Sequence, residues 1–116
     1  MTIKPLRLSS VTLRRQQLIR ACQVLGFGEV RRIRVQDGDP NLEAGSLVAD
    51  ERLDRPEDPR PEIGLNDFEL CQEWCRLLAR LDQIRDGVIE RIEVRAGIPR
   101  RVLFEARIIG SLRANE

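Results

Sequence analysis

Two segments of this chain share one pattern at an offset of 59 positions. GEVRRIRVQDGDP occupies residues 28–40 and GVIERIEVRAGIP occupies residues 87–99. Both follow the pattern G-x-[VI]-x-R-I-x-V-x-x-G-x-P. A repeat this short can arise by chance, so the elements that flank it decide whether it marks a repeated structural unit.

A segment with helical periodicity precedes each copy. Apolar residues recur at three- and four-residue spacing over residues 11–25 and again over residues 68–84. Ser10 and Asn66 are the expected N-caps, because their side chains can accept hydrogen bonds from the amides of a first helical turn. A glycine follows each periodic segment, where a helix end favours a residue with positive φ. The pattern predicts two amphipathic helices.

An apolar segment also follows each copy and predicts the second strand of a hairpin. In residues 102–108, apolar and charged side chains alternate with the period of a sheet that has one buried face. Residues 47–53 align with this segment if the first copy carries four extra residues after Pro40. Val30 and Ile89 are out of phase with the apolar positions that follow them, and a β-bulge just after each would turn them inward.

The repeated unit is therefore helix, strand, turn, strand. One such unit leaves a sheet edge unpaired and too small a core, whereas two units side by side form a larger sheet. We expect one α+β domain over residues 1–116 with αββαββ order, a four-stranded antiparallel sheet and two helices on one face. Its repeats span about 11–53 and 68–108, joined by a proline-rich linker at 54–66. The expected core includes Trp74, Leu78, Leu81, Ile92, Val94 and Phe104.

The helix followed by a G-x-[VI]-x-x-I-x-V-x-x-G-x-P hairpin resembles short uncharacterised bacterial proteins of unknown function. The resemblance covers mainly residues 63–107. Because its motifs are a helix end and a hairpin turn, it implies the hairpin and no activity, cofactor or site residue. Cys22, Cys71 and Cys75 lie in the helical patterns, which is typical of reduced thiols and predicts a cytoplasmic bacterial protein.

Composition excludes several function classes. The chain has 20 Lys and Arg against 19 Asp and Glu, a net charge of +1, so it lacks the overall charge of a dedicated nucleic-acid binder. No apolar run approaches the roughly 18 residues of a membrane helix. The chain contains no histidine and no tyrosine, and no nucleophile elbow, phosphate loop or dinucleotide fingerprint. We therefore expect no catalytic residue, no cofactor and no enzymatic activity.

Three features that could carry chemistry have structural explanations. Cys71 and Cys75 stand one helical turn apart, but a structural zinc needs four ligands and Cys22 is the only other thiol. Asp-Gly-Asp at 37–39 lacks the later acidic ligands of a calcium loop and is typical of a hairpin turn. Asp82 and Asp86 stand one turn apart near a helix C-terminus, where the dipole disfavours them, and are expected to form an exposed polar end of that helix. We expect core thiols, a turn and no bound metal.

The outward face of the sheet is the candidate interaction surface. Simple alternation places Val30, Val48 and Ile89 there, beside arginines and three acidic residues. The arginines and the exposed leucine that we predict to form the surface are Arg32, Arg34, Arg52, Arg91, Arg95, Arg101, Arg107 and Leu103.

Apolar residues mixed with arginine are typical of protein interfaces, so we predict a homodimer or a complex with another protein. The alternative is a nucleic-acid-associated protein that uses the arginines. It is less favoured because no aromatic side chain is expected on this face: Phe104 points inward, while Phe27 and Phe68 flank helices. A solvated face with ion pairs across strands is the third interpretation.

Overall fold

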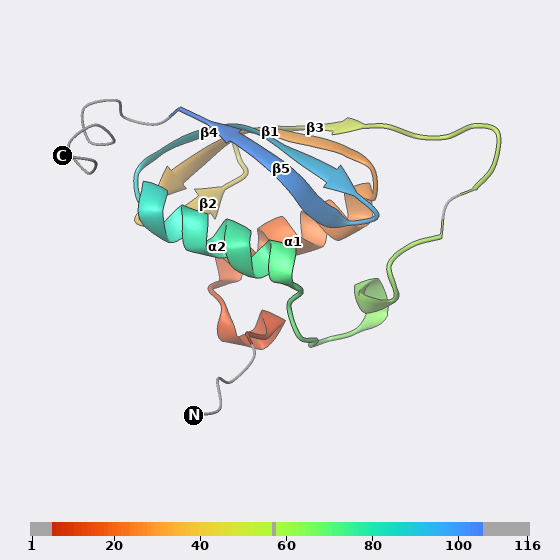
Figure 1. The fold of residues 1–116 in the computed structure, drawn as a ribbon, viewed down its shortest axis with the longest axis horizontal. Helices are drawn as coiled ribbons and strands as arrows, with labels where there is room; N and C mark the ends of the chain where they lie inside the picture. Colours follow the sequence, from red (N-terminus) through yellow and green to blue (C-terminus); the bar gives the residue numbers. More distant parts are fainter. Residues whose placement is uncertain (1–5, 57, 106–116) are drawn as a thin grey trace.

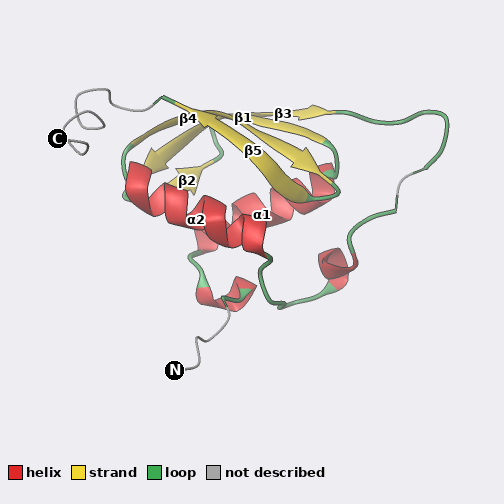
Figure 2. Cartoon of the chain, in the orientation of Figure 1, coloured by secondary structure: helices red, strands yellow, loops and turns green. Residues whose placement is uncertain are grey.

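The computed structural model describes residues 6–56 and 58–105. The strands form one antiparallel sheet and both α-helices cover the same face of it (Figure 1), so the fold is a two-layer α+β arrangement, as expected (Figure 2). In chain order the elements, with η marking short 3-10 helices, are η1 (Leu8–Ser10), α1 (Leu13–Leu25), β1 (Gly28–Gln36), β2 (Asp39–Asn41), β3 (Ser46–Ala49), η2 (Pro61–Gly64), α2 (Gln72–Ile84), β4 (Gly87–Arg95) and β5 (Ile98–Phe104).

The sheet has five strands, which corrects the four that the sequence predicts. Its order is β2-β1-β4-β5, and β3 pairs with β1 next to β2. The fifth strand arises because residues 42–45 leave the ladder and divide the second strand of the first hairpin into β2 and β3. Val30 pairs with Leu47, whereas Ile89 pairs with Phe104, so the first hairpin carries two extra residues after its proline rather than four.

An irregularity in β1 at Arg32 accompanies the turning of three apolar side chains toward the helices. Val30, Ile33 and Val35 are all fully buried, although strict alternation would place the first of them outside. The β1–β4 ladder passes over Arg32 and Glu90, and Arg32 has a φ of +56°. The predicted inward rotation is therefore present, but β1 and β4 keep one register here. The register shift lies between β4 and β5, from Ile89 to Arg91, near the bulge predicted for the second hairpin.

Helix α1 begins at Leu13, two residues later than it would with the expected N-cap, Ser10. Thr12 is the N-cap, and its Oγ1 accepts a hydrogen bond from the amide of Arg15 at 3.2 Å. Ser10 instead closes η1, where its hydroxyl donates to the carbonyl of Arg7 at 2.7 Å. The prediction of Ser10 as N-cap was wrong because two cap-forming residues lie close together and tertiary structure selects between them.

Helix α2 begins at Gln72, later than the predicted start at residue 68. The preceding residues are extended because they pair with the N-terminal segment: Leu8 donates to the carbonyl of Phe68 at 3.0 Å, and Leu70 donates to that of Leu6 at 2.8 Å. Asn66 therefore caps no helix. A helix-compatible sequence is held extended here by backbone hydrogen bonds to a distant segment.

Asp67 also joins the N-terminal segment to the residues before α2, through side-chain hydrogen bonds. Its Oδ2 accepts a hydrogen bond from Arg7 Nε at 3.0 Å, and its Oδ1 accepts one from the amide of Ser9 at 2.9 Å. The hydrogen bond from Arg7, followed by the bond from the Ser9 amide, lowers the pKa of Asp67 to about 2. The charged carboxylate therefore binds the N-terminal segment to the residues before α2.

The two hairpins turn in the same way. In the first, Asp37 and Gly38 have φ of +53° and +80°; in the second, Ala96 and Gly97 have +53° and +72°. Two successive positive φ values at a two-residue loop define a type I′ turn, whose twist matches that of the flanking strands. Asp-Gly suits this turn, whereas alanine is unusual at its first position.

Each hairpin turn rests on the end of the opposite helix. The amide of Gly38 donates to the carbonyl of Arg85 at 2.9 Å, and the amide of Gly97 donates to that of Gly26 at 2.8 Å. Gly26 and Arg85 are the C-caps of α1 and α2, with φ of +74° and +58°. A left-handed residue at each helix end therefore presents its carbonyl to the turn of the other hairpin.

The core lies between the helices and the inner face of the sheet. Five of the six residues predicted to be buried are buried: Trp74, Leu78, Leu81, Ile92 and Val94. Phe104 is only half buried, because it lies at the end of the edge strand β5, with the guanidinium of Arg80 5.2 Å from the centre of its ring. The predicted core is right except at its margin.

Candidate functional site

The predicted arginine surface is only partly assembled. Five of its arginines lie on strands of the sheet and are exposed or half buried: Arg32, Arg34, Arg91, Arg95 and Arg101. Leu103, on β5, is also exposed. Arg52 does not belong to the sheet, because β3 ends at Ala49 and the chain leaves as a loop. Arg107 lies outside the described residues.

The apolar part of this surface is smaller than predicted. Val30 points into the core, and Ile89 is also fully buried. Val48 and Leu103 stay exposed, and Val88 on β4 is an exposed apolar residue that the prediction missed. The outer face, meaning the side of the sheet away from the helices, is therefore more polar than a typical interface core.

Ion pairs reduce the positive charge of the outer face. Arg31, which the prediction did not include, pairs with Glu29 at 2.8 Å, and Arg101 lies 3.7 Å from a carboxylate oxygen of Glu93. Exposed pairs of this kind contribute little to stability, but each places a carboxylate beside an arginine. The strands therefore do not form a continuous cationic track for a phosphate backbone.

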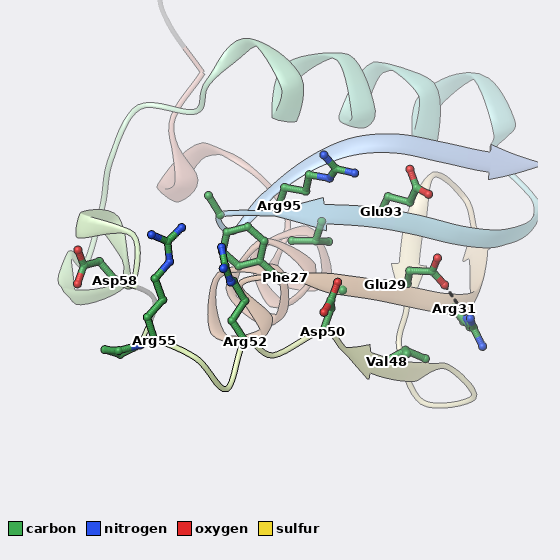
Figure 3. A pocket seen from close by; sticks show the side chains of 14 residues that line it. Phe27, Glu29, Arg31, Val48, Asp50, Arg52, Arg55, Asp58, Glu93 and Arg95 are labelled. Atoms are coloured by element: carbon green, nitrogen blue, oxygen red, sulfur yellow. Dashed lines mark hydrogen bonds and ion pairs between the residues drawn. The ribbon is translucent and has the colours of Figure 1, made fainter.

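A cleft of about 880 Å³ opens at one end of the outer face (Figure 3). Its walls are the start of β1, the end of β4 and the loop that follows β3. The charged residues around it are Glu29, Arg31, Asp50, Arg52, Arg55, Asp58, Glu93 and Arg95. The aromatic residue Phe27 also lines the cleft. Its volume is in the range of small-molecule sites.

The arginines of the cleft differ in how they are engaged. Arg52 donates to both carboxylate oxygens of Asp54, at 3.1 and 2.7 Å, and this hydrogen bonding lowers the pKa of Asp54. Arg31 is held by Glu29. Within residues 6–56 and 58–105, Arg55 and Arg95 form no ion pair. Among the described residues, these two guanidinium groups at the cleft have no carboxylate partner.

Phe27 supplies the aromatic ring that sequence reasoning did not expect on this face. It follows α1, as predicted, but it also lines the cleft. Gly26 and Gly28, with φ of +74° and +146°, flank it and allow the chain to reverse between α1 and β1. An aromatic residue between two glycines at a helix–strand junction was the signal that could have located it.

A second candidate surface is the outer edge of β3. All four of its residues, Ser46 to Ala49, are exposed, with Leu47 at 53% and Val48 at 38%. The strand contains no charged residue and no proline. Natural edge strands usually carry such residues to prevent pairing with other chains.

The other edge positions are better protected. Pro40 lies within β2, and β5 contains Pro99, Arg100 and Arg101. Proline removes a ladder donor, and arginine opposes the approach of a second strand of the same kind. The unprotected backbone edge is therefore concentrated at β3.

The cysteines do not form a site. Cys22 is fully buried in the core, and burial raises the pKa of its thiol to about 12, so it is an inert apolar side chain. Cys71 and Cys75 are half buried beside the core. Across the described ranges, no cluster of three His, Cys, Asp or Glu side chains suits a metal ion, and no helix is long and apolar enough to cross a membrane.

Two aspartates near the end of α2 hold the first hairpin turn. Asp82 accepts a hydrogen bond from Arg15, whose Nη2 also donates to the carbonyl of Gly38 at 3.0 Å. Asp86 accepts a hydrogen bond from the amide of Asp37 at 3.0 Å. These contacts explain why carboxylates stand where the helix dipole disfavours them, and they make a catalytic role unnecessary.

No family model matches the chain, and no curated protein and no solved structure shows significant similarity to it. The functional argument therefore depends on the geometry of the cleft and of the β3 edge. These two features lie close together, because Val48 of β3 also lines the cleft.

Proposed function

We propose that this protein is a non-enzymatic self-association module in which two copies pair through β3. The observation that carries the proposal is the exposed β3 edge, where an uncharged, proline-free strand leaves one side of its backbone without a partner among the described residues. An extended edge of this kind binds another strand through main-chain hydrogen bonds. Antiparallel pairing about a twofold axis would join two five-stranded sheets into one.

A second copy suits this edge better than an unrelated partner. The short apolar sequence Leu47-Val48 lies at the centre of β3, so a twofold axis there would place Leu47 of each copy opposite the partner's Val48. Helix α1, which packs against β2 on the same side of the sheet, exposes Leu13 at 69% and Val24 at 74%. A copy that covered edge and helix together could bury about 800 Å² per partner, as a standard interface does.

We also propose that the two halves are tandem copies of one helix–hairpin unit. Support comes from the β1–β4 register, which is unchanged when the halves are exchanged: Gly28 pairs with Val94, and at an offset of 59 Gly87 pairs with Val35. The reciprocal hydrogen bonds from the hairpin turns to the opposite helix ends follow the same exchange. A unit that pairs with its own copy inside the chain is consistent with strand pairing between chains.

Light scattering coupled to size-exclusion chromatography tests self-association. We expect a mass of about 27 kDa at micromolar concentration, twice the 13.3 kDa of the chain, and little change in high salt because the contact is mainly apolar. Leu47→Lys should give a monomer with an unchanged circular dichroism spectrum. Leu103→Lys, an equally exposed site on the outer face, should remain dimeric. A wild-type mass of 13.3 kDa at all concentrations would contradict the proposal.

The alternative function, association with nucleic acid, is favoured by one observation. Phe27 lies in a cleft with arginines, although the remainder of the outer face alternates arginine with glutamate. Binding through the whole face would weaken steeply as salt is added, because phosphate contacts release counterions. Binding of single-stranded oligonucleotide that weakens in this way would support the alternative over simple self-association.

A further inference from the structure

We propose that the cleft beside β1 binds a nucleotide, with the base stacked on Phe27 and the phosphate held by Arg55 and Arg95. The two proposals can be tested separately, because Leu47, the residue that tests pairing through β3, does not line the cleft, although its neighbour Val48 does. The shared chemistry is a planar base joined to a phosphate, as a free nucleotide or as one residue of a single strand.

The cleft brings one aromatic ring together with arginines, and acidic side chains lie among them. Figure 3 shows Phe27 between Arg55 on one side and Arg95 on the other, with Arg52 beside it. Asp58 lies beyond Arg55, and Glu29 and Arg31 lie toward the far end of the cleft. The three arginines come from two separate segments, the loop after β3 and the end of β4. An aromatic ring beside several guanidinium groups can receive a base and its phosphate together.

Arg55 and Arg95 are the residues best suited to the phosphate. Neither forms an ion pair within the part of the chain that the structure describes, whereas Arg52 already binds Asp54 through two hydrogen bonds. A guanidinium group binds phosphate oxygens through paired, charge-assisted hydrogen bonds. Arg55 belongs to the loop after β3, so a phosphate bound to it would also tie this loop to the ligand.

Among the described residues that line the cleft, Phe27 is the only aromatic one, and it is half buried, so its ring is supported. Stacking on such a ring accepts any base, because each base presents a π-face. Asp50 lines the same cleft and its carboxylate can accept a hydrogen bond from an exocyclic amino group. We therefore expect adenine and cytosine nucleotides to bind better than uracil nucleotides.

Isothermal titration with AMP, CMP, UMP and ribose 5-phosphate tests the proposal. AMP and CMP should bind, UMP more weakly, and ribose 5-phosphate, which lacks a base, weakest. Phe27→Leu, which keeps an apolar side chain, should weaken AMP binding about fivefold or more. Arg55→Gln and Arg95→Gln should each weaken it about tenfold. Arg76→Gln, an exposed arginine on α2, is the matched control and should bind as wild type.

Short single-stranded oligonucleotides distinguish the two sources of the nucleotide. Stronger binding than AMP, with steep salt dependence, would assign the site to a strand, and equal binding would assign it to a free nucleotide. Absence of binding by all of these probes would overturn the proposal, as would ribose 5-phosphate binding as tightly as AMP. A glutamate-rich peptide that binds as well as AMP and is unaffected by Phe27→Leu would show a general anion site instead. The exposed arginine variants test the site even if Phe27→Leu alters the fold.

Discussion

The backbone amide of Gly38 donates a hydrogen bond of 2.9 Å to the carbonyl oxygen of Arg85, the C-cap of α2. The corresponding bond of the second hairpin, from Gly97 to Gly26, is 2.8 Å long. Each turn therefore satisfies a carbonyl at the end of the helix in the other half of the chain, where such groups lack intrahelical partners. The two halves are joined through these bonds as well as through the β1–β4 ladder.

Ala96→Gly should stabilise the protein by about 1 kcal/mol in urea unfolding, because Ala96 holds a φ of +53° that disfavours a Cβ atom. Ala79→Gly, at an exposed position inside α2, is the control and should destabilise by about 1 kcal/mol. Equal destabilisation by both substitutions would show that the turn does not strain Ala96.

Gly28→Ala should destabilise by about 2 kcal/mol or more, because Gly28 has a φ of +146° and a Cβ there would overlap the carbonyl oxygen of Val48. Gly87 occupies the equivalent place in the sequence pattern, but a Cβ on it would meet only the side chain of Ile84, at 3.3 Å. Gly87→Ala should therefore cost much less. Thermal or urea unfolding of both variants measures the difference, and similar losses would contradict the close approach of β3.

Stability should fall in acid partly through Asp67. Its pKa is lowered to about 2 in the folded protein, below the usual 3.8. A depressed pKa means that the carboxylate contributes stability above about pH 4, and that this contribution is lost as the pH falls toward 2. Asp67→Asn should lower the melting temperature at neutral pH and flatten its decline between these pH values. Parallel pH curves for the two proteins would exclude this role.

Phe104→Ala should lower the free energy of unfolding by about 2 kcal/mol, less than the 3 to 5 kcal/mol typical of a fully buried phenylalanine. The reason is that Phe104 is half buried at the end of β5. Leu81→Ala, which removes a fully buried side chain, should cost about 3 kcal/mol or more and is the comparison. A Phe104 variant as damaging as the Leu81 variant would contradict the half-buried position of the ring.

Much of the fold could be predicted because the spacing of apolar residues and the residue preferences of turns depend on positions close together in the sequence. The helical stripe around Trp74 and Leu78, the Asp-Gly turn and the inward rotation of Val30 each follow from residues that are close in sequence. The division of the second strand into β2 and β3 could not be predicted, because residues 42–45 carry no signal strong enough to show where pairing to β1 stops. The site was predicted less well than the fold.

Arg95 illustrates the limit for the site. Alternation placed it correctly on the outer face, but nothing local showed that Phe27 and Arg55, distant in sequence, line the same cleft. The arginine surface also included Arg52, which leaves the sheet because β3 ends at Ala49. Which side chains meet at the cleft depends on where the loop after β3 crosses the sheet. The path of a loop cannot be predicted from residue periodicity, because a loop has no regular repeat.

The amino-acid sequence by itself determined the elements: two amphipathic helices, hairpins with positive-φ turns, and the residues of the core, because each depends on spacing and conformational preference within a few positions. Tertiary structure alone decided how those elements end and what meets at the surface. Residues 68–70 are extended rather than helical because they pair with the N-terminal segment. Phe27 faces a cleft because strands and a loop from distant positions enclose it. Both outcomes come from hydrogen bonds and contacts between segments far apart in the chain, whose energies exceed the small local preferences that a sequence pattern records.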